Sequence, residues 1–233
     1  MNVIEIVPTN TCPPNLSELT SSSRAIAAFS KDVQLDISDG VFTNVRSWPY
    51  GEGQWAEVES MASSSLPLSE ILTYEIHLMV EDPVRIGALL ARAGSRRIIA
   101  HTEVFADADG VSEAFALWRK AGAREIGLAI LIETPLSALE PHISHCDVVQ
   151  VMSITTLGSQ GASYDARAVS RIEELHLKYP SLTIEVDGGV GESNIKDLAR
   201  AGARRFGVGS AIMKAADPAA AYTHLKDSAE KAI

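Results

Sequence analysis

Two aspartates, Asp36 and Asp187, each stand at the end of a short apolar segment that runs into a glycine-containing turn. A buried strand that carries an acid at its carboxyl end is a common way for α/β enzymes to present catalytic groups. If two such strand ends face each other across one mouth, one carboxylate can remove a proton and the other can return one to the opposite face. The pattern predicts acid–base chemistry that inverts a stereocentre, with Asp36 and Asp187 as the catalytic pair.

Two further polar residues accompany this pair. Gln34 lies two positions before Asp36, so both side chains leave the same face of a strand. His77 ends another apolar segment, where it could orient a substrate hydroxyl or bind a metal. A single histidine at a strand end is also commonly a structural, hydrogen-bonded residue, and the pattern leaves both interpretations open.

Glycines follow three successive strand candidates near the end of the chain. Backbone N–H groups in such loops can approach an anion, and in α/β barrels the last two loops commonly bind phosphate. Glycines also form ordinary turns, and these loops alone would suit a flavin or nucleotide binder equally well. The residues that we expect to bind phosphate are Gly158, Ser159, Gln160, Gly188, Gly189, Gly209 and Ser210.

A repeated α–β unit must position these residues, because a nearly identical Ala-Gly-x-Arg joint occurs at 93–96, 121–124 and 201–204. Each copy follows a helix-like segment and precedes an apolar run, as expected when a glycine ends a helix. We expect strands at 3–7, 33–37, 73–79, 97–102, 125–130, 147–152, 183–186 and 205–208. We expect helices at 15–29, 54–64, 83–93, 111–121, 136–143, 166–179, 194–201 and 218–231. This alternation predicts a single α/β domain over residues 1–233, a (β/α)8 TIM barrel, with an open doubly wound sheet as the alternative.

Composition restricts the partners. The 233 residues carry 20 basic and 30 acidic side chains, and the net charge of −10 argues against nucleic acid and anionic membranes. No apolar stretch is long enough to span a bilayer, and the first residues lack the features of a signal peptide. The two cysteines fit neither a disulfide framework nor a zinc motif, so we expect a cytoplasmic protein.

Five segments resemble the signature segments of the ribulose-phosphate 3-epimerase family, in that family's order and at about its spacing: 33–40, 75–80, 151–153, 186–190 and 208–212. The resemblance covers essentially the whole chain. It implies a (β/α)8 barrel that interconverts D-ribulose 5-phosphate and D-xylulose 5-phosphate at carbon 3, an isomerase of the pentose phosphate pathway. It also implies that Asp36 and Asp187 exchange protons with the substrate, and that the substrate contacts Thr9, His77, Met79 and Met152.

The family's divalent metal, often zinc, is bound by two histidines and two aspartates. The resemblance carries three of these ligands over to Asp36, His77 and Asp187, whereas Gln34 occupies the fourth position. Glutamine offers only a neutral amide oxygen, and zinc prefers imidazole, thiolate or carboxylate. The family's glycine-rich phosphate loop is also poorer in glycine here, at 155–160.

Three functions remain compatible with these departures. They are a ribulose-phosphate epimerase with altered metal use, an epimerase of a related ketose phosphate such as allulose 6-phosphate, and a phosphosugar-binding barrel with impaired catalysis. A decarboxylase or aldolase on a related barrel is disfavoured, because those enzymes carry a lysine between two aspartates in the second strand, and residues 36–39 hold none. Family members usually self-associate, so the resemblance also implies a homo-oligomer.

Overall fold

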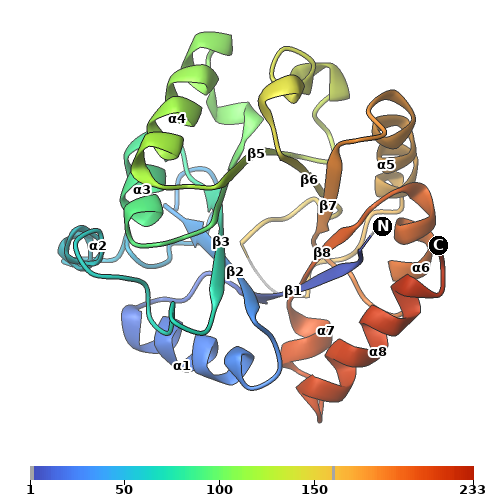
Figure 1. The fold of residues 1–233 in the computed structure, drawn as a ribbon, viewed down its shortest axis with the longest axis horizontal. Coiled ribbons are helices and arrows are strands. Elements are labelled where there is room, and N and C mark those ends of the chain that lie inside the picture. Colours follow the sequence, from blue (N-terminus) through green and yellow to red (C-terminus); the bar gives the residue numbers. More distant parts are fainter. Residues whose placement is uncertain (1–2, 159–160) are drawn as a thin grey trace.

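Eight parallel strands close into a barrel in simple chain order, from β1 to β8 and back to β1. The computed structural model describes residues 3–158 and 161–233. Figure 1 looks down the barrel, with the strands around the centre and the helices outside them. The strands are β1 (Glu5–Asn10), β2 (Asp32–Ser38), β3 (Thr73–Met79), β4 (Arg97–His101), β5 (Glu125–Ile130), β6 (Val148–Met152), β7 (Thr183–Asp187) and β8 (Arg205–Val208). The predicted (β/α)8 barrel is confirmed.

Helices surround the strands and shield their outer faces from water (Figure 1). They are α1 (Leu16–Ala27), α2 (Trp55–Met61), α3 (Pro83–Arg92), α4 (Ala108–Ala121), α5 (Arg167–Lys178), α6 (Ile195–Ala201), α7 (Ser210–Met213) and α8 (Pro218–Glu230). Short 3₁₀ turns η1 (Thr102–Val104), η2 (Leu136–Leu139) and η3 (Ile143–His145) complete the set. Across the described residues, none of these helices combines the length and the apolar character that crossing a membrane requires.

The repeated helix-to-strand joint forms as the sequence predicts. Gly94, Gly122 and Gly202 follow α3, α4 and α6 with φ angles of 95°, 123° and 121°, a region that other residues rarely adopt. At the opposite end of α3, Asp82 accepts a hydrogen bond from the backbone N–H of Val84, and proline occupies the first turn. These local signals set the frame that brings every strand to the barrel in the same direction.

Most expected elements form with bounds shifted by a few residues, and two elements show why an expectation differs from the structure. The expected helix over 136–143 is instead the two 3₁₀ turns η2 and η3, because Pro141 would fall inside that helix, where it lacks an N–H and its ring clashes with the preceding turn. The first strand runs to Asn10 rather than ending at Val7. It pairs with β8 up to Pro8 and with β2 from Thr9 onward, so the missing N–H of the proline falls where the pairing partner changes.

The strands pair in a register that aligns the predicted site residues. Asp36 of β2 lies beside His77 of β3, and Met152 of β6 lies beside Asp187 of β7. Side chains alternate along each strand, so residues two apart share a face. At the opposite end of the barrel, the register places Glu75 of β3 beside Arg97 of β4. The barrel interior therefore holds two polar layers, one near each end of the strands.

Candidate active site

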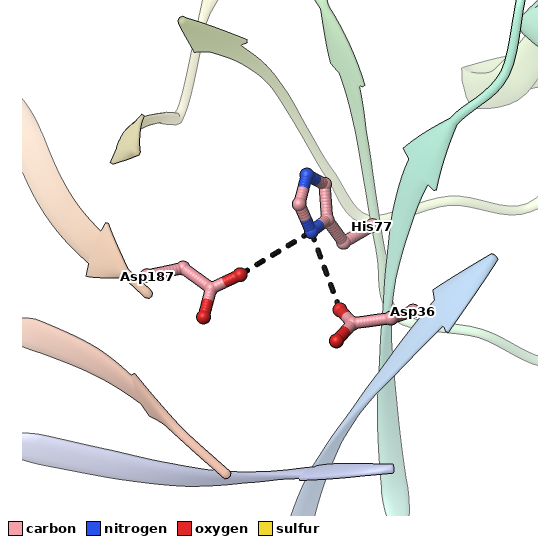
Figure 2. Close-up of side chains that lie close together, drawn as sticks. All are labelled: Asp36, His77 and Asp187. Carbon is pink, nitrogen blue, oxygen red and sulfur yellow. Dashed lines mark hydrogen bonds and ion pairs between the residues drawn. The ribbon is translucent and has the colours of Figure 1, made fainter. Parts of the chain in front are cut away.

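Three side chains from three strands meet at the carboxyl end of the barrel: Asp36, His77 and Asp187. Nδ1 of His77 lies 3.2 Å from Oδ1 of Asp36 and 3.4 Å from Oδ2 of Asp187. Figure 2 shows both carboxylates directed toward this one nitrogen. One possible ligand atom from each residue lies within 4.8 Å of the others. The barrel thus brings together two acids that are 151 positions apart in the chain (187 − 36).

Two buried glutamines fill the space around the acids. Nε2 of Gln34 donates to Oδ1 of Asp36 at 2.7 Å and to Oδ2 of Asp187 at 3.1 Å. Nε2 of Gln150, from β6, lies 3.2 Å from Oδ2 of Asp187 and 3.2 Å from Nδ1 of His77. Oε1 of either glutamine is buried without a hydrogen-bond partner among the residues that the structure describes. The two amides therefore direct N–H groups at the carboxylates and leave two buried acceptors unused.

A second histidine contacts His77 on the side of the ring that faces away from the two aspartates. Nε2 of His77 lies 3.0 Å from Nε2 of His101, which ends β4. Nδ1 of His101 in turn lies 3.2 Å from Oε2 of Glu103, and Oε1 of Glu103 accepts the backbone N–H of Leu131 at 2.8 Å. The ring of Phe42, from the loop after β2, covers His101 with ring centroids 4.6 Å apart. A continuous polar chain thus leads from Glu103 to the two aspartates.

Burial and neighbouring charges shift the proton affinities of this cluster. Burial is the main reason that the pKa of Asp36 is raised, although hydrogen bonding to His77 acts in the opposite direction. Burial alone would lower the pKa of His77, but its contacts with Asp187 and Asp36 outweigh this and raise it to about 9. Burial lowers the pKa of His101 to about 4. These shifts favour a positive charge on His77 and a neutral His101 at pH 7.

A pocket opens above these residues. Its walls come from the ends of strands β1, β2, β3, β6, β7 and β8 and from the loops that follow them. Most of the predicted site residues line it: Thr9, Asp36, Met79, Met152, Gly158, Asp187, Gly188, Gly189, Gly209 and Ser210. His77 does not line it, because its side chain is fully buried beneath the two aspartates. Ser159 and Gln160 lie outside the described residues.

The glycines after β7 are required by close packing. A Cβ at Gly188 would stand 2.6 Å from a carbon of Ile154, and a Cβ at Gly189 would stand 3.1 Å from Tyr164. Both glycines also have positive φ angles, of 105° and 65°. The loops after β6 and β7 are therefore pressed together along one side of the pocket, which is where we expect the phosphate.

Sequence reasoning did not assign roles to three site residues: Gln150, His101 and Glu103. Gln150 lies two positions before Met152 and so shares its face of the strand, which is a usable signal. His101 and Glu103 are likewise two apart after an apolar run. Their contacts depend on which strands are neighbours, and the sequence alone does not show that His101 of β4 reaches His77 of β3.

The three residues Asp36, His77 and Asp187 fit a divalent cation. Two carboxylates and one imidazole are a common donor set for zinc, manganese and iron, and catalytic sites often use three protein ligands and leave other positions open. Gln34 fills the fourth position with its N–H₂ group toward the carboxylates, and only the exchange of its amide nitrogen and oxygen would present a ligand atom. The chain therefore offers a candidate site of three residues, with Gln34 at the fourth ligand position that the family resemblance implies.

Comparison with known proteins agrees with this geometry. Residues 16–213 match the model of the ribulose-phosphate 3 epimerase family. A ribulose-phosphate 3-epimerase of Schizosaccharomyces pombe is 31% identical over 159 residues, which cover 68% of each chain. The cytoplasmic isoform of Oryza sativa subsp. japonica is 33% identical and covers 67% of this chain and 68% of its own. The enzyme of Mycobacterium leprae is 29% identical and covers 87% and 85%.

Solved structures share the barrel at low identity. A 3-hexulose-6-phosphate synthase from Salmonella typhimurium superimposes with a TM-score of 0.69 at 15% identity, over 99% of this chain and 100% of that one. KGPDC from Streptococcus mutans gives a TM-score of 0.70 at 13% identity, over 98% of each chain. These likenesses concern the fold alone. By its sequence match over residues 16–213 and its named relatives, the chain belongs to the ribulose-phosphate 3-epimerase family and is an epimerase of carbohydrate phosphates.

Proposed function

We propose that this protein interconverts D-ribulose 5-phosphate and D-xylulose 5-phosphate by proton transfer between carbon 3 and the carboxylates of Asp36 and Asp187. The observation that carries the proposal is the convergence of these two acids, from β2 and β7, on one pocket at the carboxyl end of the barrel. Family membership and the names of the relatives support the same reaction.

The two acids would act in turn on opposite faces of the substrate. One carboxylate takes the proton from carbon 3, and the electrons of the broken C–H bond move toward the adjacent carbonyl to give an enediolate. The other carboxyl group then gives its proton to carbon 3 from the opposite face, which inverts the centre. The raised pKa of Asp36 suits this role, because a general acid–base group works best with a pKa near the working pH.

The residues around the acids would prepare them for this exchange. A divalent cation bound by Asp36, His77 and Asp187 would supply positive charge close to the oxygen that becomes negative. The N–H groups of Gln34 and Gln150 hold the carboxylates in fixed orientations. Fixed orientation matters because a small misplacement of a reacting group costs much of the rate.

The substrate's two ends would contact different walls of the pocket. We assign the phosphate to the loops after β6, β7 and β8, through the backbone at Gly158, Gly188, Gly189, Gly209 and Ser210. The sugar carbons would lie over Met79 and Met152, beside the hydroxyl of Thr9. A substrate bound in this way would have its carbon 3 near the two aspartates.

Deuterium exchange at carbon 3 tests the reaction directly. The protein is incubated with D-ribulose 5-phosphate in deuterated water, with and without added zinc, and carbon 3 is followed by NMR. We expect exchange that is lost in Asp187→Asn and kept in Asp109→Asn, an exposed residue of α4. Absence of exchange under both metal conditions would contradict the proposal and favour a phosphosugar-binding barrel with impaired catalysis.

A parallel assay distinguishes the substrates. We propose the five-carbon ketose phosphate, and the six-carbon allulose 6-phosphate is the competing substrate. The ratio of their kcat/KM values decides between them, and a higher value for allulose 6-phosphate would reassign the enzyme. We also propose a cytoplasmic location, which fits the two free cysteines, Cys12 and Cys146. The homo-oligomer that the family resemblance implies is a separate proposal. Light scattering of the purified protein tests the oligomer.

A further inference from the structure

Two buried histidines face each other through the same atom type, which limits where their protons can lie. Nε2 of His77 and Nε2 of His101 are 3.0 Å apart, and both side chains are fully buried. Two imidazole nitrogens at this distance form a hydrogen bond only if one carries a proton and the other offers a lone pair. The shared proton must be bonded to Nε2 of one of the two histidines.

The contact between Glu103 and His101 indicates which nitrogen of His101 carries a proton. Oε2 of Glu103 lies 3.2 Å from Nδ1 of His101, and Oε1 of Glu103 accepts the backbone N–H of Leu131. An ionised carboxylate only accepts hydrogen bonds, so Nδ1 of His101 must carry a proton. A neutral imidazole has one N–H, and Nε2 of His101 is then the acceptor.

It follows that the shared proton belongs to His77. We propose that Glu103 and His101 are positioning residues that keep a proton on Nε2 of His77, so that Nδ1 of His77 is the nitrogen that serves the aspartates and a bound metal. Nδ1 is also the nitrogen that faces Asp36 and Asp187, at 3.2 and 3.4 Å. The proposal deepens the proposed function and rests on it for its effect on the reaction.

The reverse arrangement is disfavoured by the surroundings. If His101 owned the shared proton, it would carry two N–H groups and a positive charge beside one carboxylate, Glu103. His77 stands beside two carboxylates, so the charge is better placed there. A histidine ligand that donates its other N–H to a fixed acceptor is a common way to orient a metal-binding ring.

NMR of protein labelled with ¹⁵N-histidine tests the proton's location without any activity measurement. We expect a coupling between the two Nε2 nuclei across the hydrogen bond, with the proton directly bonded to Nε2 of His77. Addition of Zn²⁺ should shift the Nδ1 signal of His77 and leave the Nε2–H in place. A proton bonded to Nε2 of His101 would overturn the proposal. So would loss of the Nε2–H of His77 when Zn²⁺ is added.

Glu103→Gln tests the control exerted by Glu103. A glutamine has one oxygen, and if this oxygen keeps the N–H of Leu131, the amide N–H₂ turns toward His101. That reverses both tautomers, so that the one proton of a neutral His77 ring lies on Nδ1, the nitrogen that a metal would need. We expect Zn²⁺ affinity, measured by calorimetry, to fall roughly 10- to 100-fold. The matched control Glu113→Gln, on the exposed face of α4, should bind Zn²⁺ as the wild type does; an unchanged affinity in Glu103→Gln contradicts the proposal.

Substitutions of His101 test whether this residue acts as a hydrogen-bond acceptor or only fills space. His101→Gln can present an amide oxygen to Nε2–H of His77 and should keep most Zn²⁺ affinity, whereas His101→Leu should lose it. Equal loss in both variants would contradict the proposal. The outcomes also separate the two proposals. If the proton lies on His77 but the protein catalyses no carbon-3 exchange, only the proposed epimerase reaction is contradicted. If exchange occurs but the proton lies on His101, only the positioning role of Glu103 and His101 is contradicted.

Discussion

The interior of the barrel contains two polar layers with opposite properties. At the amino-terminal end, two acids and two arginines alternate as ion pairs: Glu75, Glu185, Arg97 and Arg205. Arg97 binds Glu75 at 2.6 Å, and Arg205 binds Glu75 at 2.8 Å and Glu185 at 3.2 Å. At the carboxyl-terminal end, two acids meet one histidine and two neutral amides.

The difference lies in whether the positive partner can give up its proton. Arginine keeps its charge at any pH that a protein survives, so the acids of the amino-terminal layer have fixed partners. Histidine and amides offer no fixed charge, so the acids of the carboxyl-terminal layer can exchange protons with a substrate or bind a cation. The first layer suits structural stability, and the second suits chemistry.

The largest effect is expected on catalysis. Asp187→Asn or Asp36→Asn should lower the rate of carbon-3 exchange by roughly 10²- to 10⁴-fold, because one proton-transfer group is lost. The free energy of unfolding should change little, since the substitution removes one of two buried like charges but also one of the two carboxylates that pair with His77. Exchange rates and urea unfolding measure the two quantities. A variant that unfolds easily but exchanges normally when folded would reverse the roles of the layers.

The amino-terminal layer should show the opposite behaviour. Arg97→Met leaves the buried Glu75 with one partner fewer and should lower the free energy of unfolding by about 3–5 kcal/mol. The rate per folded molecule should change little. Arg85→Met, which breaks the exposed pair with Glu59, should cost at most about 1 kcal/mol. Equal losses for the two arginines would show that the buried layer is not a special source of stability.

The two buried histidines of the metal-free site should contribute most to the stability of the fold near pH 6.5. The raised pKa of His77, about 9 when folded against 6.5 when unfolded, stabilises the fold fully below pH 6.5, and this contribution is lost as the pH rises through 9. It amounts to at most about 3 kcal/mol. The lowered pKa of His101, about 4, acts the other way, and stability is lost as the pH falls from 6.5 to 4. Urea unfolding in a chelator measures both limbs.

Two variants test whether each histidine causes the loss of stability on its side of pH 6.5. His77→Gln should flatten the alkaline limb, and His101→Gln should flatten the acidic limb. If either variant retains the full pH dependence of the wild type, another group controls that limb.

The smallest effect is expected at Gln34. Gln34→His replaces an N–H donor between the carboxylates with an imidazole ligand, and it should tighten Zn²⁺ binding roughly tenfold, about 1.4 kcal/mol. Gln34→Leu removes the same donor without adding a ligand and serves as the control. Calorimetry with Zn²⁺ compares them, and equal affinities in both variants would argue against a fourth ligand position at residue 34.

Local physics explains how much of the fold the sequence predicts. Apolar runs specify the strands, and glycines after helices specify the joints, because only glycine adopts their backbone angles without strain. The strands β3, β5 and β8 have the expected bounds. The expected helix over 136–143 was wrong, because Pro141 falls inside it. A single residue without an N–H outweighs a favourable pattern when it falls inside a helix.

Short segments of the sequence are enough to predict the two aspartates near strand ends and to recognise the family. The surroundings of the two aspartates depend on how the strands assemble. This assembly turned the amide nitrogen of Gln34 toward both acids, brought Gln150 between Asp187 and His77, and placed His101 behind His77. The physical reason is that these contacts join strands distant in the chain, and barrel closure and register set which side chains meet. The same closure separates the acids that can exchange protons from those that arginine holds in place.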